Sequence, residues 1–143
     1  LGYLVGRSHF QLLHRMRNIL DEQALEESHF YAMSVMNIQP RLTLEQLNSH
    51  LDYTGHSISK DDMKFLESLD IIEKQKGSYY QLTESGRDTS LHHIARAKAI
   101  EEELISTIGI ADVMTLKLLL KRLIKTTDPG LPDLWFQQEK NDE

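Results

Sequence analysis

The stretch "HSISKDDMK", from His56 to Lys64, combines hydrogen-bond donors with two adjacent acids. Serine hydroxyls and lysine ammonium groups can bind phosphates and the edges of bases. Asp61 and Asp62 would repel the same phosphates. On a helix they stand about 100° and 200° around from Lys60, so one or both can turn away from a ligand that Lys60 contacts. Two interpretations stay open at this point, a helix that reads nucleic acid and a helix of solvated charges.

The seven histidines raise the question of a metal site. His92 and His93 are adjacent and diverge by about 100° on a helix, while His9 and His14 are five residues apart. Neither pair has the i, i+4 spacing of a helical zinc site. We therefore expect no metal or other cofactor, and we interpret these residues as polar or interface histidines.

Enzymatic motifs are missing from the sequence. It contains no nucleophile elbow, no phosphate-binding glycine loop and no metal-ligand spacing. It also contains no cysteine, which excludes disulfides, thiolate metal sites and cysteine nucleophiles. Acidic runs such as "EEE" at 101–103 are typical of a solvated surface. The protein is predicted not to be an enzyme.

The composition predicts a globular protein of one domain, or of two small lobes that share a core, because 40% of the 143 residues are apolar. No apolar stretch approaches the roughly 20 residues that cross a bilayer, and no leader is visible, so we expect a cytoplasmic protein without a membrane partner. The formal net charge is −6, and acids outnumber bases in each of the segments 1–27, 28–86 and 87–143. Any nucleic-acid binding must then rest on a few well-placed cations.

Apolar spacing predicts a mainly α chain with a small β-hairpin. Helices are expected over 3–20, 26–38, from a cap at Thr43, over 57–69, from a cap at Thr83 to 108, and over 112–125. Two short β-type runs flank Gly77, so a helix, a short turn and a helix precede a hairpin. Trp135 and Phe136 lie in the tail, where they either pack on a partner's helices or belong to a disordered end.

This order of elements resembles the multiple-antibiotic-resistance regulator (MarR) family of winged helix–turn–helix proteins over nearly the whole chain. "LGYLVGR" resembles the family's opening helix, and "LTLEQLNSHL" its first motif helix. "LESLDIIEK" is similar to the family's "LE..G[LI][IV]E[KR]" run, with Asp70 in the glycine position. "YQLTESGR" resembles the run that joins the wing to the dimer helix, and it is the most specific match.

The resemblance implies a homodimer that binds a double-stranded, pseudo-palindromic operator and represses by occupying a promoter. It implies a helical dimerisation region at 1–27 and 84–143 and a DNA-binding winged lobe at 28–83. It also implies a small aromatic or phenolic effector bound between the lobes, at His9, Leu13, Phe30 and His93, although simple packing between the lobes is an alternative for each. The DNA contacts expected on the two motif helices and the wing are Thr43, His56, Ser57, Ser59, Lys60, Lys64, Lys74, Lys76 and Ser78.

Two departures from the family pattern bear on these expectations. The wing tip, "EKQKGSY", is short and offers no arginine for the minor groove. An alignment from "SIS" puts Lys60 on a base-facing position, whereas an alignment backwards from "LE" puts Asp62 at a normally apolar site. The rival interpretation is therefore a dimeric interaction protein that keeps the fold and has lost DNA binding.

Overall fold

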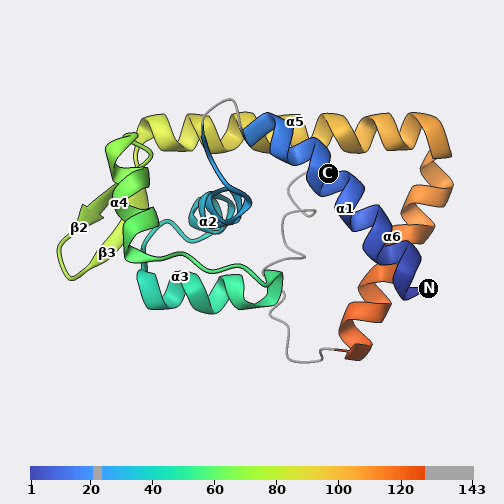
Figure 1. Cartoon of the computed structure of the whole chain (residues 1–143), viewed down its shortest axis with the longest axis horizontal. Helices are drawn as coiled ribbons and strands as arrows, with labels where there is room; N and C mark the ends of the chain where they lie inside the picture. The colour runs from blue at the N-terminus through green and yellow to red at the C-terminus, as the bar shows by residue number, and fades with distance from the viewer. Residues whose placement is uncertain (21–23, 128–143) are drawn as a thin grey trace. The chain divides into compact units, whose positions relative to one another are not determined.

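A computed structural model describes residues 1–20 and 24–127 of the chain. Its elements in order are α1 (Gly2–Leu20), α2 (Glu27–Ile38), β1 (Leu42–Thr43), α3 (Leu44–Leu51), the 3-10 turn η2 (Asp52–Thr54), α4 (Lys60–Ser68), β2 (Ile72–Gln75), β3 (Tyr79–Leu82), α5 (Glu84–Ile108) and α6 (Ile110–Thr127) (Figure 1). The predicted class, mainly α with a small β-wing, is confirmed. None of the described helices is long and apolar enough to cross a membrane. Trp135 and Phe136 lie outside the described residues.

The chain divides into two compact units, residues 1–101 and the residues from 102 onward. These units are defined by how compactly the chain is packed. The functional division that was expected, with boundaries at 27/28 and 83/84, is a different one and stays a prediction. The core of the first unit centres on α2, which contacts α1, α3 and β3. Five consecutive residues of α2, at 32–36, are buried, so this helix has no solvent face along that stretch. It is therefore the buried central helix of the unit.

The sheet has three antiparallel strands in the order β1-β3-β2. The hairpin of β2 and β3 confirms the wing that was predicted around Gly77, and it lies beside α4 (Figure 1). β1 was not predicted, because two residues are too few for a periodic signal. Its pairing of Leu42 with Tyr80 and of Thr43 with Tyr79 attaches the wing directly to the start of α3.

Capping side chains explain where the helices of the winged lobe begin. Thr43 caps α3 as predicted, with its Oγ1 accepting from the Gln46 N–H at 3.2 Å and the Gln46 side chain accepting from the Thr43 N–H at 2.9 Å. The predicted start of the next helix at Ser57 was wrong, because α4 begins at Lys60 with Ser59 as its cap. His56 and Ser57 therefore precede the helix and do not belong to its first turn.

The junction between wing and α5 shows why the "LTESG" run has its particular residues. Thr83 caps α5 as predicted, since its Oγ1 accepts from the Gly86 N–H at 2.9 Å. A Cβ on Gly86 would lie 1.8 Å from the Ile71 carbonyl oxygen, so only glycine lets the helix pass this close to the chain before β2. Asp70, which occupies the glycine position of the family run, has a φ of +56°, a left-handed value that aspartate tolerates better than most residues.

The second unit carries an unusual amount of exposed apolar surface. α6 begins after Gly109, whose φ of +97° ends α5 as the sequence predicted. Val113 is buried, whereas most of the other large apolar side chains of α6 are exposed: Ile110, Met114, Leu116, Leu118, Leu119, Leu123 and Ile124. Exposed apolar area of this extent is typical of a protein–protein interface.

Candidate nucleic-acid interface

A cleft of about 520 Å³ opens between the start of α3, the exposed side of α4 and the wing. Five of the expected DNA contacts line it: Thr43, Lys60, Lys64, Lys74 and Ser78. The structure thus brings together residues from three elements that are far apart in the sequence. The other expected contacts, His56, Ser57, Ser59 and Lys76, do not line the cleft.

The cleft is only weakly positive. Its lining residues include three lysines and two glutamates, Glu45 and Glu67, which leaves one excess positive charge. Neither glutamate was singled out from the sequence, because helix periodicity alone does not show which exposed side chains face the wing. A groove of this kind attracts phosphate modestly, so contacts with individual phosphates and bases must supply what bulk charge does not.

Asp61 is directed to solvent and to a lysine of the same helix. Its Oδ1 lies 3.0 Å from the Lys64 Nζ, and 89% of its side chain is exposed. The hydrogen bond and the charge of Asp61 raise the pKa of Lys64. The carboxylate therefore offsets part of the charge that Lys64 offers to the cleft, although it does not line the cleft itself.

Asp62, in contrast, is turned back toward the body of the protein. Its Oδ2 accepts from the Ser59 N–H at 2.7 Å, and its own N–H donates to the Ser59 Oγ at 3.1 Å. Hydrogen bonding to Ser59, reinforced by the nearby His29, lowers the pKa of Asp62. The second acid of "KDD" is thus a capping residue of α4, which resolves why a carboxylate occupies the first turn of a helix that faces a basic cleft.

His29 holds the first turn of α2 in a related way. Its Nδ1 accepts from the Glu26 N–H at 2.9 Å, which places the ring proton on Nε2 in the neutral tautomer. Nε2 lies 3.6 Å from the Asp62 Oδ1, and the His29 side chain is buried. The ring also lies 5.5 Å from the Phe65 ring of α4. The buried histidine was not recognised from the sequence, since nothing local distinguishes it from the other six.

Asn48 fixes the loop that enters α4. Its Oδ1 accepts from the Ile58 N–H at 2.7 Å, and its Nδ2 donates to the Ile58 carbonyl at 2.9 Å. Ile58 is itself buried. The amide of Asn48 therefore holds both backbone groups of one loop residue, one position before the Ser59 cap, and so sets where α4 begins. This positioning residue was also missed, because its partner lies in a loop without periodicity.

Two cationic side chains near the sheet make cation–π contacts with tyrosine rings. The guanidinium carbon of Arg41 lies 4.5 Å from the centre of the Tyr79 ring, and the Nζ of Lys74 lies 5.8 Å from the centre of the Tyr80 ring. Cation–π contacts of this kind restrict a long side chain and so reduce the entropy that it loses on binding a phosphate. Tyr80 lines the cleft beside Lys74. Arg41 and the two tyrosines are additions to the residues expected from the sequence.

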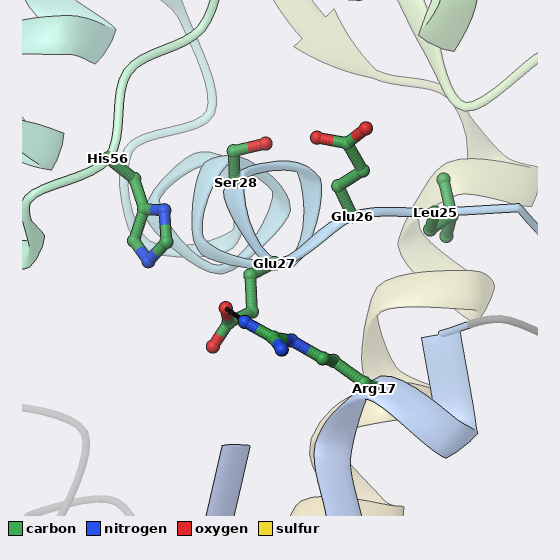
Figure 2. A pocket seen from close by; sticks show the side chains of 6 residues that line it. All are labelled: Arg17, Leu25, Glu26, Glu27, Ser28 and His56. Atoms are coloured by element: carbon green, nitrogen blue, oxygen red, sulfur yellow. Dashed lines mark ion pairs between the residues drawn. The ribbon is translucent and has the colours of Figure 1, made fainter. Parts of the chain in front are cut away.

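His56 lies at a second cavity, a pocket of about 310 Å³ lined by Arg17, Leu25, Glu26, Glu27, Ser28 and His56 (Figure 2). Its ring is 5.1 Å from the ring of Tyr31 on α2, at an interplanar angle of 30°. The structure thus associates His56 with the start of α2, and not with the other expected DNA contacts.

The four expected effector residues are distributed over three helices of the first unit. On α1, His9 is exposed with its ring 6.0 Å from that of Phe10, and Leu13 is half-buried. Phe30 of α2 is half-buried and contacts Tyr31 edge-on at 5.6 Å, and His93 of α5 is buried. None of the four lines the cleft or the pocket at His56, so their role as an effector site stays a prediction.

Solved structures that are similar to this chain include proteins of the MarR family. The reduced form of MarR from Escherichia coli has a TM-score of 0.72 and 19% identity, over 86% of this chain and 92% of that one. A MarR family protein of Mycobacterium tuberculosis in complex with DNA has a TM-score of 0.73 and 19% identity, over 86% and 96% of the two chains. The same protein in complex with p-aminosalicylic acid has a TM-score of 0.67 and 18% identity, over 86% and 97%.

No protein-family model matches the chain, and no curated protein is significantly similar to it in sequence. At these low identities the structural similarity demonstrates a shared fold. The chain therefore has the MarR winged-helix fold, as the resemblance implied.

Proposed function

We propose that the protein is a homodimeric, DNA-binding transcription regulator that represses by occupying an operator. The observation that carries this proposal is the convergence of Lys60, Lys64 and Lys74 on one cleft between α4 and the wing. In helix–turn–helix proteins the second helix enters the major groove by its N-terminal end. Lys60 is the first residue of α4, so its ammonium group is suitably placed to reach a base edge or a phosphate. The DNA complex of a protein with this fold supports the same assignment.

A binding selection on random duplexes, at low and moderate salt, tests DNA recognition. It should enrich a pseudo-palindromic sequence. Lys60→Ala should then weaken binding by about 1–3 kcal/mol if Lys60 contacts a base, or reduce the salt slope by about one unit if it contacts a phosphate. Arg87→Ala removes an equal charge from an exposed position in the first turn of α5 that does not line the cleft, and it serves as the control. Equal losses in the two variants would argue that only net charge matters.

The dimer is supported by apolar surface that is exposed in each unit. On α1 the exposed side chains include Leu1, Tyr3, Leu4 and Phe10, and on α6 they include Met114, Leu116 and Leu119. An obligate dimer should bury roughly 2,000 Å² or more. Sedimentation should show a dimer at micromolar concentration, and Leu119→Lys should shift it toward monomer. A folded monomer of the parent chain would contradict the proposal.

The rival function, a dimeric interaction protein without DNA binding, is favoured by one observation. The cleft has a single excess positive charge, and Asp61 engages Lys64 beside it. If no duplex is enriched at either salt concentration while the chain is folded and dimeric, this rival replaces the regulator.

An effector between helices α1, α2 and α5 completes the proposal. A mixed aromatic and histidine lining suits an aromatic acid or a phenol. A protein with this fold has been solved with p-aminosalicylic acid, which makes that compound a reasonable probe. It should release the enriched duplex from the parent chain, and His9→Ala should require more of it. Unchanged release by the variant would remove His9 from the site.

A further inference from the structure

The pocket at His56 has a composition that differs from the effector site expected above. It is formed by the end of α1, the first turn of α2 and the loop that precedes α4 (Figure 2). Its charged lining residues are two carboxylates, Glu26 and Glu27, and one guanidinium, Arg17. The charged lining is therefore negative by one unit, which disfavours an aromatic acid and favours a cation.

Glu27 is the residue with an unused binding capacity. Only 10% of its side chain is exposed, and its Oε1 is buried without a hydrogen-bond donor among the described residues. A buried carboxylate oxygen without a hydrogen-bond donor is unfavourable. A ligand whose N–H donates to this carboxylate therefore binds with a favourable contribution to the free energy. Its negative charge also acts on the surroundings, because it adds to burial in raising the pKa of Tyr31.

Arg17 satisfies Glu27 only in part. Figure 2 shows the guanidinium reaching from α1 to one carboxylate oxygen of Glu27, while the Glu26 side chain leaves in the opposite direction. The Arg17 Nη2 lies 3.5 Å from the Glu27 Oε2, which is longer than the distance of about 2.7–2.9 Å of a strong charge-assisted hydrogen bond. Since 59% of the Arg17 side chain is exposed, it can move aside without opening the core.

The remaining lining residues suit a small apolar body. Leu25 is buried at one side of the pocket, and the His56 ring, which lies 5.1 Å from the Tyr31 ring, forms another wall. A volume of about 310 Å³ lies at the lower end of the range for small-molecule sites. A single ring or a short alkyl chain fits this size.

We propose that this pocket binds a small organic cation, an ammonium or amidinium group on a compact apolar body, through the Glu27 carboxylate. The cation shares Oε2 with Arg17, or replaces Arg17 there and then donates to both carboxylate oxygens, while the apolar body rests between Leu25 and His56. The ligand proposed for this pocket is a cation, whereas the aromatic acid proposed as an effector is an anion. It is independent of the proposed DNA binding, because its residues do not line the cleft.

Calorimetric titration of the whole chain with benzamidine, without DNA, tests the site. Benzoate has nearly the same shape and the opposite charge, and it should not bind there. Glu27→Gln keeps the size of the side chain and removes its charge, and it should weaken benzamidine binding by about tenfold or more. Glu84→Gln removes the same charge from an exposed position at the start of α5 that does not line the pocket, and it should leave the affinity nearly unchanged.

Arg17→Met provides a test of opposite sign, and it keeps the proposal testable if Glu27→Gln fails to fold. Because it removes the competing cation and leaves Glu27 in place, it should tighten benzamidine binding. The proposal is overturned if the parent chain does not bind benzamidine, if benzoate binds as tightly, if Glu27→Gln binds as the parent does, or if Arg17→Met loses binding.

Discussion

The Nε2 of His29 and the Oδ1 of Asp62 lie 3.6 Å apart, and this approach connects the first turn of α2 to the first turn of α4. Each residue also receives a backbone hydrogen bond from its own helix start, His29 from Glu26 and Asp62 from Ser59. Two helix caps are thus coupled through an imidazole and a carboxylate. The contact therefore fixes the position of the start of α4 relative to the buried helix α2.

Asp61 and Asp62 should differ in their effect on stability although they are adjacent. Asp62→Ala removes the acceptor of the Ser59 N–H and should lower the free energy of unfolding by about 1 kcal/mol. Asp61→Ala removes an exposed pair with Lys64 and should change it by less than about 0.5 kcal/mol. Urea denaturation of both variants measures the difference. Equal losses would mean that the cap contributes nothing.

Asp62 should also impose a pH dependence on stability. Its pKa is lower in the folded protein than the usual value of about 3.9. The ionised carboxylate therefore stabilises the fold above that value, and this contribution is lost as the pH falls through the lowered pKa. The stability difference between the parent chain and Asp62→Asn should shrink on acidification from about pH 7 to about pH 3. A difference that stays constant over that range would exclude Asp62 as the source.

Asp61 and Asp62 should also differ in their effect on DNA affinity. Asp61→Asn leaves Lys64 without its partner carboxylate and should tighten binding to duplexes of any sequence, with a gain that shrinks as salt rises. Asp62→Asn should give no such gain, because its carboxylate faces Ser59 and His29 and not the cleft. Anisotropy titrations at two salt concentrations compare them. A larger gain from Asp62→Asn would mean that Asp62, and not Asp61, lies near the DNA, which would contradict this prediction.

Asn48 should matter to both stability and DNA binding. Asn48→Ala leaves the N–H and the carbonyl of Ile58 without their partners, which should cost about 1–3 kcal/mol. Asn48→Asp keeps an acceptor for the N–H but replaces the donor with a carboxylate oxygen that repels the Ile58 carbonyl, so it should lose at least as much stability. Because the loop then positions α4 less well, both variants should bind the selected duplex more weakly in the same order. Unfolding curves and titrations of the three proteins test this ranking.

The features that the sequence predicted correctly are local ones. Thr43 and Thr83 cap their helices through atoms three residues away, and Gly109 ends α5 by its own backbone conformation. The start of α4 was misplaced although "SKDD" carries a local signal, a serine with an acid three residues later. Of the two acids, Asp62 has a capping role that its charge alone did not predict, whereas Asp61 pairs with Lys64 at the surface.

The features that were missed are contacts between distant segments. Asn48 with Ile58 and His29 with Asp62 depend on how α2, α3 and α4 pack, and no periodic pattern encodes such pairs. For the same reason, the sequence could nominate Lys60, Lys64 and Lys74 but could not show that two glutamates line the same cleft. The direction of His56 toward Tyr31 likewise follows from packing around the start of α2.

The short strand β1 has a consequence for the motions of the lobe. Because Leu42 and Thr43 pair with Tyr80 and Tyr79, the cap of α3 cannot separate from the wing without breaking the sheet. Backbone amides that open in one cooperative event have a common opening free energy and therefore the same protection factor against exchange with solvent deuterium. The amides of β1 and β3 should therefore share one protection factor, whereas a wing that swings alone would exchange first. The two sides of the cleft that come from the start of α3 and from the wing should accordingly move together.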